Sequence, residues 1–287
     1  NKPIITVNHM EGHLLSVFAE SKSKIQNTEI KINPNSQNYN NLKRITQNRL
    51  PVPPAIGFLI SGGNTQLIFV KDLNNYQKVG ETIDDACGEA YDKCARLLNL
   101  PYPGGKSLAS KAEQGRDRGI VAQEKKGAKG RFVQINFKEM SLELPIPMLK
   151  SGDLNFSFSG IKTAFKYLVQ RLEKEGPLDD EIISVLAVLF EESVILQLIY
   201  KLESAIQKYQ PKEIWVGGGV ISNEYIKKRI GEVSQRYNLN FRYPKEFNLR
   251  TDNAAMIGIA AYMKLLRLED LEDLKNKPQD ELAALDI

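Results

Sequence analysis

The sequence contains few cysteine, histidine and tryptophan residues. Of its 287 residues, only two are cysteine, two are histidine and one is tryptophan. Cys87 and Cys94 lie seven positions apart on a predicted helix, so at 1.5 Å per residue their α-carbons are about 10 Å apart, beyond disulfide reach. We therefore expect two reduced thiols packed in a core and no disulfide framework.

Long apolar runs are also absent. The most apolar stretch, residues 182–200, is interrupted by serine, glutamate and glutamine, and it falls short of the roughly 18 uninterrupted residues of a membrane span. We expect neither a span nor a membrane partner. The chain opens on Asn1 and directly on a strand pattern, which indicates a fragment, so the lack of a signal-peptide pattern decides nothing about targeting.

Charge of one sign is not in large excess. The 39 Lys and Arg residues exceed the 35 Asp and Glu residues by four, and 42% apolar with 26% charged residues is a globular balance. Basic residues gather in two places: Lys43, Arg44 and Arg49, and then Arg116, Arg118, Lys125, Lys126, Lys129 and Arg131. Such clusters permit a polyanionic partner, and solvated loops are the alternative interpretation.

Strand and helix patterns alternate along the chain, which predicts an α/β protein. The expected strands are 3–7, 56–60, 67–70, 76–80, 213–216 and 241–243. The expected helices begin at His9 and near Asp84, and then cover 107–114, 162–172, 180–209, 222–237 and 253–268. We expect Asp84 and Asp85 to cap the helix that they precede, and Thr251 to cap the last helix.

Two segments lack a clear pattern. Residues 21–54 are rich in Asn, Lys and Gln, and residues 115–147 are basic, so we interpret both as exposed surface insertions. The acidic tail after residue 268 is expected to fray.

The two histidines form the most informative local pattern. His9 and His13 are four positions apart, which places both imidazoles on one face of a helix, as a divalent metal site requires. Local hydrogen bonding of both rings explains the pair alone equally well. A third ligand is needed, and Asp252, at the start of a distant helix, is the acid that the pattern favours.

Two turns and one acidic run could contact a ligand. The turns at 61–65 and 217–219 offer backbone N–H groups without side-chain obstruction, which suits phosphate or ribose, although most such turns are only turns. The run from Asp84 to Asp92 places acids beside Gly88, where they could accept hydrogen bonds from ribose hydroxyls. A solvated face with capping acids is the alternative.

Seven blocks in order carry a resemblance to a known family. They are His9-Met10-Glu11-Gly12-His13, Ser61-Gly62-Gly63, residues 81–92, Tyr102-Pro103-Gly104-Gly105, Phe156-Ser157-Phe158-Ser159-Gly160, Gly218-Gly219-Val220 and Thr251-Asp252-Asn253-Ala254-Ala255. Together they resemble the TsaD family and span residues 9 to 255. The resemblance implies an α/β, actin-like ATPase (ASKHA, RNase H-like) fold of two lobes. Residues 1–54 would end the N-terminal lobe with the metal-binding helix and an insertion, and residues 55–287 would form the C-terminal lobe with the hairpin, a helical insert and the nucleotide-binding elements.

The resemblance also implies an activity. Members of the family transfer a threonylcarbamoyl group from threonylcarbamoyl-adenylate to N6 of adenosine 37 in tRNAs that read codons starting with A, so an acyltransferase is expected. One divalent metal ion, iron or zinc, would be bound by His9, His13 and Asp252. The substrate-binding positions that match the family are Leu59, Ile60, Ser61, Gly62, Gly63, Asp92, Gly105 and Asn223. No general base is evident among them.

The implied partners are tRNA, a YrdC-type synthase that makes the adenylate, and a second copy in a homodimer. The Asn- and Lys-rich segments resemble those of fungal mitochondrial members, which favours the mitochondrial matrix, with the cytoplasm as the alternative. Three features depart from the family pattern: Asn64 replaces a usual histidine, Ala109 replaces an acid of some members, and the opening Glu-Thr-Ser-Cys-Asp-type block is missing. Without that block we expect the chain alone to be inactive.

Three rival functions stay open at this point. A metallopeptidase is disfavoured because Glu11 lies midway between the histidines rather than directly after the first. A sugar-kinase or chaperone-like ATPase would share the fold but has no need of paired histidines. A non-catalytic scaffold of a tRNA-modifying complex is the third.

Overall fold

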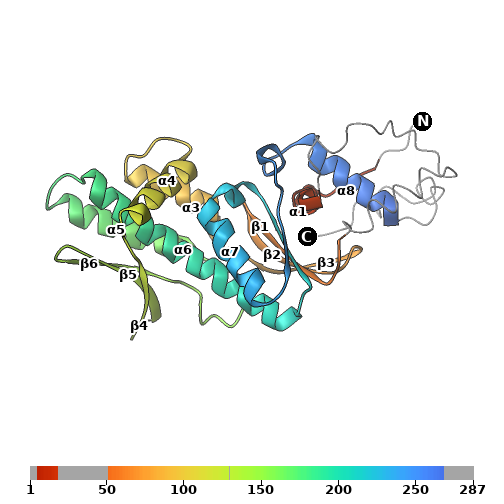
Figure 1. The fold of residues 1–287 in the computed structure, drawn as a ribbon, viewed down its shortest axis with the longest axis horizontal. Helices are drawn as coiled ribbons and strands as arrows, with labels where there is room; N and C mark the ends of the chain where they lie inside the picture. Colours follow the sequence, from red (N-terminus) through yellow and green to blue (C-terminus); the bar gives the residue numbers. More distant parts are fainter. Residues whose placement is uncertain (1–4, 19–50, 129, 268–287) are drawn as a thin grey trace.

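The computed structural model describes residues 5–18, 51–128 and 130–267. Its centre is a five-stranded sheet in the order β3-β2-β1-β7-β8 (Figure 1). The strands are β1 (Ala55–Ile60), β2 (Thr65–Asp72), β3 (Asn75–Glu81), β7 (Glu213–Gly217) and β8 (Asn240–Arg242). The first three pair antiparallel as a meander, whereas β1, β7 and β8 run parallel. Helices cover the sheet, which confirms the predicted α/β class, the hairpin and the third strand.

The central strand β1 is buried along its whole length. Because side chains alternate across a strand, Ile56, Phe58 and Ile60 enter the larger core while Ala55 and Leu59 enter the smaller one. The helices of the larger core are α3 (Cys87–Leu97), α4 (Gly104–Asp117), α5 (Ser159–Glu173), α6 (Asp180–Tyr209) and α7 (Glu224–Arg236). The smaller core lies under α1 (His9–Leu15), the 3-10 turn η1 (Ser16–Phe18) and α8 (Ala254–Arg267).

The long helix α6 crosses the larger core. Asp179 caps it by accepting a hydrogen bond of 2.8 Å from the Ile182 amide. In length and composition α6 would also suit a membrane span, but 89% of its apolar window is buried inside the protein, as in the core helix of a globular domain. The absence of a span stays a prediction.

Both cysteines are free and buried, as expected. Burial raises the pKa of the Cys87 thiol and of the Cys94 thiol well above the usual range.

The prediction that Asp84 and Asp85 cap α3 is wrong. The Cys87 amide at the start of that helix donates to the Thr65 hydroxyl at 2.9 Å. Asp84 instead caps α5, because it accepts from the amides of Phe158 at 2.8 Å and Ser159 at 3.2 Å. Asp84 is therefore a helix-capping residue, as predicted, but the helix that it caps begins some 75 residues further along the chain.

The prediction of an exposed, unpatterned insertion at 115–147 is also wrong over most of its length. Three antiparallel strands form there: β4 (Gln123–Gly127), β5 (Gly130–Phe137) and β6 (Met140–Pro145). Val133 and Ile135 on β5 and Leu142 and Leu144 on β6 are buried in the larger core. Their period of two is a strand signal that the many basic residues conceal.

The C-terminal part follows the predicted order of strand, glycine turn and helix, with 3-10 turns η3 (Gly219–Ser222) and η4 (Phe247–Leu249) added. Thr251 does not cap α8; the Asn253 side chain accepts from the Met256 amide at 2.9 Å instead. Of the expected strand at 3–7, residues 5–7 have no regular structure. Most of the insertion at 21–54 and the acidic tail lie outside the described residues, and the division at residue 54 stays a prediction.

Candidate functional site

The paired histidines lie on α1, a short helix that begins with a strong cap. The Asn8 side-chain oxygen accepts hydrogen bonds from the amides of Met10 at 2.8 Å and Glu11 at 3.3 Å. At 3.6 residues per turn, His9 and His13 point from the same face. The His13 side chain is 10% exposed and that of His9 is 55% exposed, so one ring is anchored in the protein and the other faces solvent.

Glycines allow α1 to sit unusually close to the sheet and to α8. A Cβ on Gly217 would lie 2.6 Å from the His13 carbonyl oxygen, and one on Gly57 would lie 2.5 Å from Leu14 Cδ1. On the opposite side, a Cβ on Gly12 would lie 3.3 Å from Ile257 Cδ1 in α8. The helix is therefore held between the sheet and α8, and this close packing brings the loop before α8 next to the histidines.

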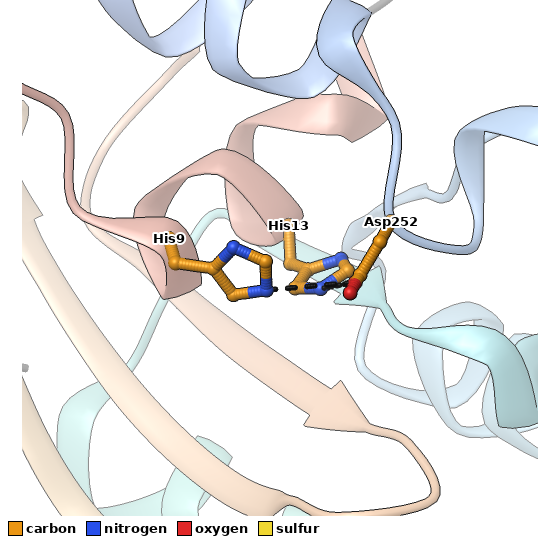
Figure 2. A group of neighbouring side chains, drawn as sticks. All are labelled: His9, His13 and Asp252. Atoms are coloured by element: carbon orange, nitrogen blue, oxygen red, sulfur yellow. Dashed lines mark ion pairs between the residues drawn. The ribbon is translucent and has the colours of Figure 1, made fainter.

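Asp252 lies in that loop and completes a group of three ligand atoms (Figure 2). Its Oδ1 is 2.9 Å from His13 Nε2 and 3.5 Å from His9 Nε2, and the three atoms lie within 4.8 Å of one another. Ligand distances of about 2.0–2.2 Å around a tetrahedral metal place neighbouring ligand atoms about 3.3 Å apart. Two of the three separations bracket that value and the third is no more than 4.8 Å, so a small movement of one imidazole would let the group hold one metal ion.

A residue that the sequence did not single out holds the Asp252 loop. Arg250, 9% exposed, donates from Nε to the Pro244 carbonyl and from a terminal nitrogen to the Lys245 carbonyl, both at 3.0 Å. These two hydrogen bonds from a buried guanidinium fix the loop that precedes α8 and carries Asp252. The only sequence signal was an arginine two positions before the proposed ligand.

The electrostatics of the site favour neutral imidazole. Burial lowers the pKa of His13, the nearby His9 lowers it further, and Asp252 offsets part of the decrease. A neutral ring is the form that binds a metal. Its Nδ1 is buried and has no hydrogen-bond partner among the described residues, while Nε2 faces Asp252.

Glu11 does not join this group. It is 1% exposed and lies about 200° around the helix from each histidine, since each is two positions away. A peptidase general base would have to reach the metal side of the helix. The geometry therefore gives no support to the metallopeptidase reading.

The predicted substrate-binding turn lies beside the start of α3. The Gly88 amide donates to the Ser61 carbonyl at 3.1 Å, and a Cβ on Gly88 would lie 2.8 Å from that oxygen. Gly62 and Gly63 are exposed, with open space where a Cβ would be. The side chains of Leu59 and Ile60 are buried in the two cores, so only their backbone could contact a substrate.

The other predicted positions come from helix starts close to this turn. Asp92 on α3 accepts from the Gly105 amide at 2.9 Å, which fixes the start of α4. Asn223 caps α7 through the amides of Tyr225 at 3.0 Å and Ile226 at 3.1 Å. Its side-chain nitrogen donates to Glu191 at 2.6 Å, so most of its hydrogen-bonding capacity is used inside the protein.

Glu191 connects the helices that carry these residues. In the sequence it is notable only as an acid inside an apolar run. Its carboxylate is fully buried on α6 and accepts from Tyr91 at 3.3 Å, from Arg116 and from Asn223. Burial raises the pKa of Glu191, and these partners offset only part of the rise. One side chain thus connects α3, α4 and the start of α7.

All these groups surround the carboxyl ends of the parallel strands β1 and β7. Gly218, with φ of 92°, follows β7, and a Cβ there would lie 2.4 Å from the Ile60 carbonyl oxygen at the end of β1. Gly217 contacts the His13 backbone, and the Ser61 turn contacts Gly88. In α/β sheets, ligands bind outside the carboxyl ends of parallel strands. The candidate metal centre and the substrate-binding turns therefore meet at the carboxyl ends of β1 and β7.

Comparison with known proteins identifies the family. Residues 40–259 match the family model TsaD, described as tRNA N6-adenosine threonylcarbamoyltransferase. The chain belongs to the TsaD family. The match covers Asp252 and the substrate-binding turns but not the histidine pair.

Curated relatives carry the same description. The tRNA N6-adenosine threonylcarbamoyltransferase of Chromobacterium violaceum is 35% identical over 287 residues, covering 99% of this chain and 69% of the relative. Those of Polaromonas sp. (strain JS666) and Polynucleobacter necessarius are 35% and 36% identical, covering 92% and 93% of this chain and 61% and 62% of the relatives. This TsaD-family chain thus spans about three-fifths to two-thirds of the relatives that it matches.

A solved structure shows the fold. Full-length HypF, in a phosphate- and nucleotide-bound form, aligns with a TM-score of 0.55 and 10% identity, covering 92% of this chain and 36% of that chain. At this identity the likeness concerns the fold alone. With the family match it confirms the predicted actin-like ATPase fold for the TsaD-family chain.

Proposed function

We propose that the protein carrying this chain transfers a threonylcarbamoyl group from threonylcarbamoyl-adenylate to N6 of adenosine 37 in tRNAs that read codons starting with A. The observation that carries the proposal is the convergence of His9, His13 and Asp252 at the sheet edge that also carries the glycine turns. The relatives' shared description as transferases names the reaction.

We propose that one divalent ion, iron or zinc, is held by His9 Nε2, His13 Nε2 and an Asp252 oxygen. Two imidazoles and one carboxylate suit both metals, and three protein ligands leave coordination positions for a substrate. When bound, such an ion orients the adenylate and polarises its oxygens.

In the proposed reaction, the exocyclic amine of the tRNA adenosine attacks the carbamoyl carbon. A carbon–nitrogen bond forms, the bond from that carbon to the phosphate oxygen breaks, AMP leaves with the electron pair, and the amine loses a proton to solvent water. The backbone of the exposed residues Gly62 and Gly63 suits the acyl-phosphate end, and Asp92, Gly105 and Asn223 suit the adenosine. No general base is evident among these residues, so orientation and electrostatics would supply much of the catalysis.

The partners belong to the same proposal. A YrdC-type synthase would supply the adenylate, and two copies of the protein would form a homodimer. The mitochondrial matrix is the proposed location, supported by the Asn- and Lys-rich composition of residues 21–54.

The test is product formation. The full-length protein is incubated with tRNA, ATP, threonine, bicarbonate and a YrdC-type synthase, and threonylcarbamoyl-adenosine is measured by mass spectrometry. His9→Ala and Asp252→Ala should abolish the product, whereas Glu139→Ala, which removes an exposed acid far from the site in sequence, should not. No product from the wild type while the adenylate accumulates would point to an ATPase or a scaffold instead.

A further inference from the structure

A hollow lies between α3 and α5, apart from the residues of the candidate site. It has a volume of about 290 Å³ and is lined by Lys93, Leu97, Lys162, Thr163, Lys166 and Tyr167. Each helix contributes residues four positions apart, which share a face. We call these six residues the α3–α5 hollow.

Two of the three lysines of the hollow bind one carboxylate. Asp85 accepts from Lys93 Nζ at 2.7 Å and from Lys162 Nζ at 2.6 Å, and Lys93 also pairs with Glu89 at 2.7 Å. Lys166 has no ion pair with any residue in the described ranges. Asp85 and Glu89 thus hold the ammonium groups of Lys93 and Lys162 in place and offset their charge. The three lysines set against these two carboxylates leave one net positive charge on the rim, at Lys166.

An exposed aromatic ring completes the rim. Tyr167 is 66% exposed, so its ring is accessible from solvent. Arg171 follows one turn later on the same face of α5 and is exposed. Lysines and arginine beside an exposed tyrosine form the combination that binds unpaired nucleic acid, with cations on the phosphates and the ring against a base.

The hollow shares its helices with the candidate site. Lys93 follows Asp92, which fixes the start of α4, and Asp85 follows Asp84, which caps α5 through Phe158 and Ser159. An RNA segment in the hollow would thus be held by the same helices that position the substrate-binding residues.

We propose that the α3–α5 hollow and Arg171, one turn further along α5, bind unpaired nucleotides of the RNA substrate, with Lys166 and Arg171 on the phosphates and Tyr167 against a base. The choice of RNA rests on the proposed function. The basic stretch on β4 and β5 is the weaker candidate, because Arg131 there is held by Glu124 and Tyr200. Lys125 and Lys126 on β4 are exposed and have no ion pair within the described part of the chain, so they provide a matched control.

The experiment measures binding of a tRNA anticodon stem-loop to the full-length protein by fluorescence anisotropy at several salt concentrations. The double variant Lys166→Ala/Arg171→Ala should bind about tenfold more weakly, and its salt slope should fall by about 1.4, since each lost phosphate contact on a single strand contributes about 0.7. Lys125→Ala/Lys126→Ala, which removes the same charge, should stay within about twofold. Tyr167→Ala should weaken binding about fivefold or more while Tyr167→Phe does not.

Equal losses in the two double variants, no loss in either, or no RNA affinity in the wild type would overturn the inference. The modification assay separates this outcome from the proposed function. If Lys166→Ala/Arg171→Ala modifies limiting tRNA as fast as the wild type, the hollow is not the RNA site although the transferase stands. If neither the wild type nor any variant makes product while RNA affinity still depends on the hollow, the proposed transferase activity is refuted and the RNA site stands.

Discussion

Replacing Gly217 by alanine should displace the metal ligands without changing any of them. The added Cβ would lie 2.6 Å from the His13 carbonyl oxygen and 3.2 Å from its carbonyl carbon. Both are backbone atoms, so no rotamer change relieves the overlap. The end of β7 and the end of α1 must separate by about half an ångström, which is the tolerance within which functional groups have to be held.

The expected size of the effect follows from that overlap. Overpacking of this kind costs about 1–3 kcal/mol of unfolding free energy. Because the displaced segment carries His13, metal affinity should fall about 10- to 100-fold, the range seen when supports of metal ligands are lost. Gly219→Ala is the matched control, because a Cβ there meets nothing within 4 Å.

Two measurements check this prediction: zinc affinity by competition with a chromophoric chelator, and stability by urea unfolding. Gly217→Ala should have a lower zinc affinity and a lower unfolding free energy than the wild type. Gly219→Ala should match the wild type in both. Wild-type zinc affinity in a stable Gly217→Ala variant would refute the reasoning that close packing of α1 on β7 positions His13.

Three further predictions concern the network, the α5 cap and the metal. Glu191→Ala should cost about 3 kcal/mol in urea unfolding, because it strands Arg116, which keeps 22% side-chain exposure, whereas the exposed Glu175→Ala should cost nothing measurable. Burial raises the pKa of Asp84 but its four hydrogen bonds from residues 157–159 outweigh that, so the pKa is lowered and the cap stabilises the fold above the ordinary value of 3.8. Asp84→Asn should therefore lower Tm most at neutral pH, with a difference that shrinks as the pH falls below 3.8, and a pH-independent difference would contradict this. Chelation should lower the stability of the metal-loaded protein by about 4 kcal/mol when the free metal had been at a thousand times Kd, and His13→Ala should show no such loss.

The elements that the sequence predicted well have their signal inside one segment. The β1–β2 hairpin follows from two apolar runs around a glycine turn, and the facing histidines follow from the helical repeat. The strands β4 to β6 carried an equally local signal, the alternation at Val133, Ile135, Leu142 and Leu144, which their basic neighbours obscured.

The features that sequence reasoning missed depend on contacts between distant segments. Asp84 is a good cap, but only the tertiary structure shows that its partner is α5 rather than the adjacent α3. Glu191 looked like an interruption of an apolar helix, and its meaning comes from Arg116 and Asn223, which lie on other elements. Arg250 likewise acts through carbonyls that the sequence cannot place. The assignments of the metal and substrate residues stay predictions, which the geometry accommodates.

The most direct test of the central claim is threonylcarbamoyl transfer as a function of metal loading. Full-length protein is stripped with a chelator and titrated with iron or zinc, and modified tRNA is quantified by mass spectrometry with the adenylate in excess. We predict that transfer rises in proportion to added metal, reaches a plateau at one ion per chain, and is absent from His9→Ala/His13→Ala at every loading. Full transfer by stripped protein, or the same titration in the double variant, would contradict the account.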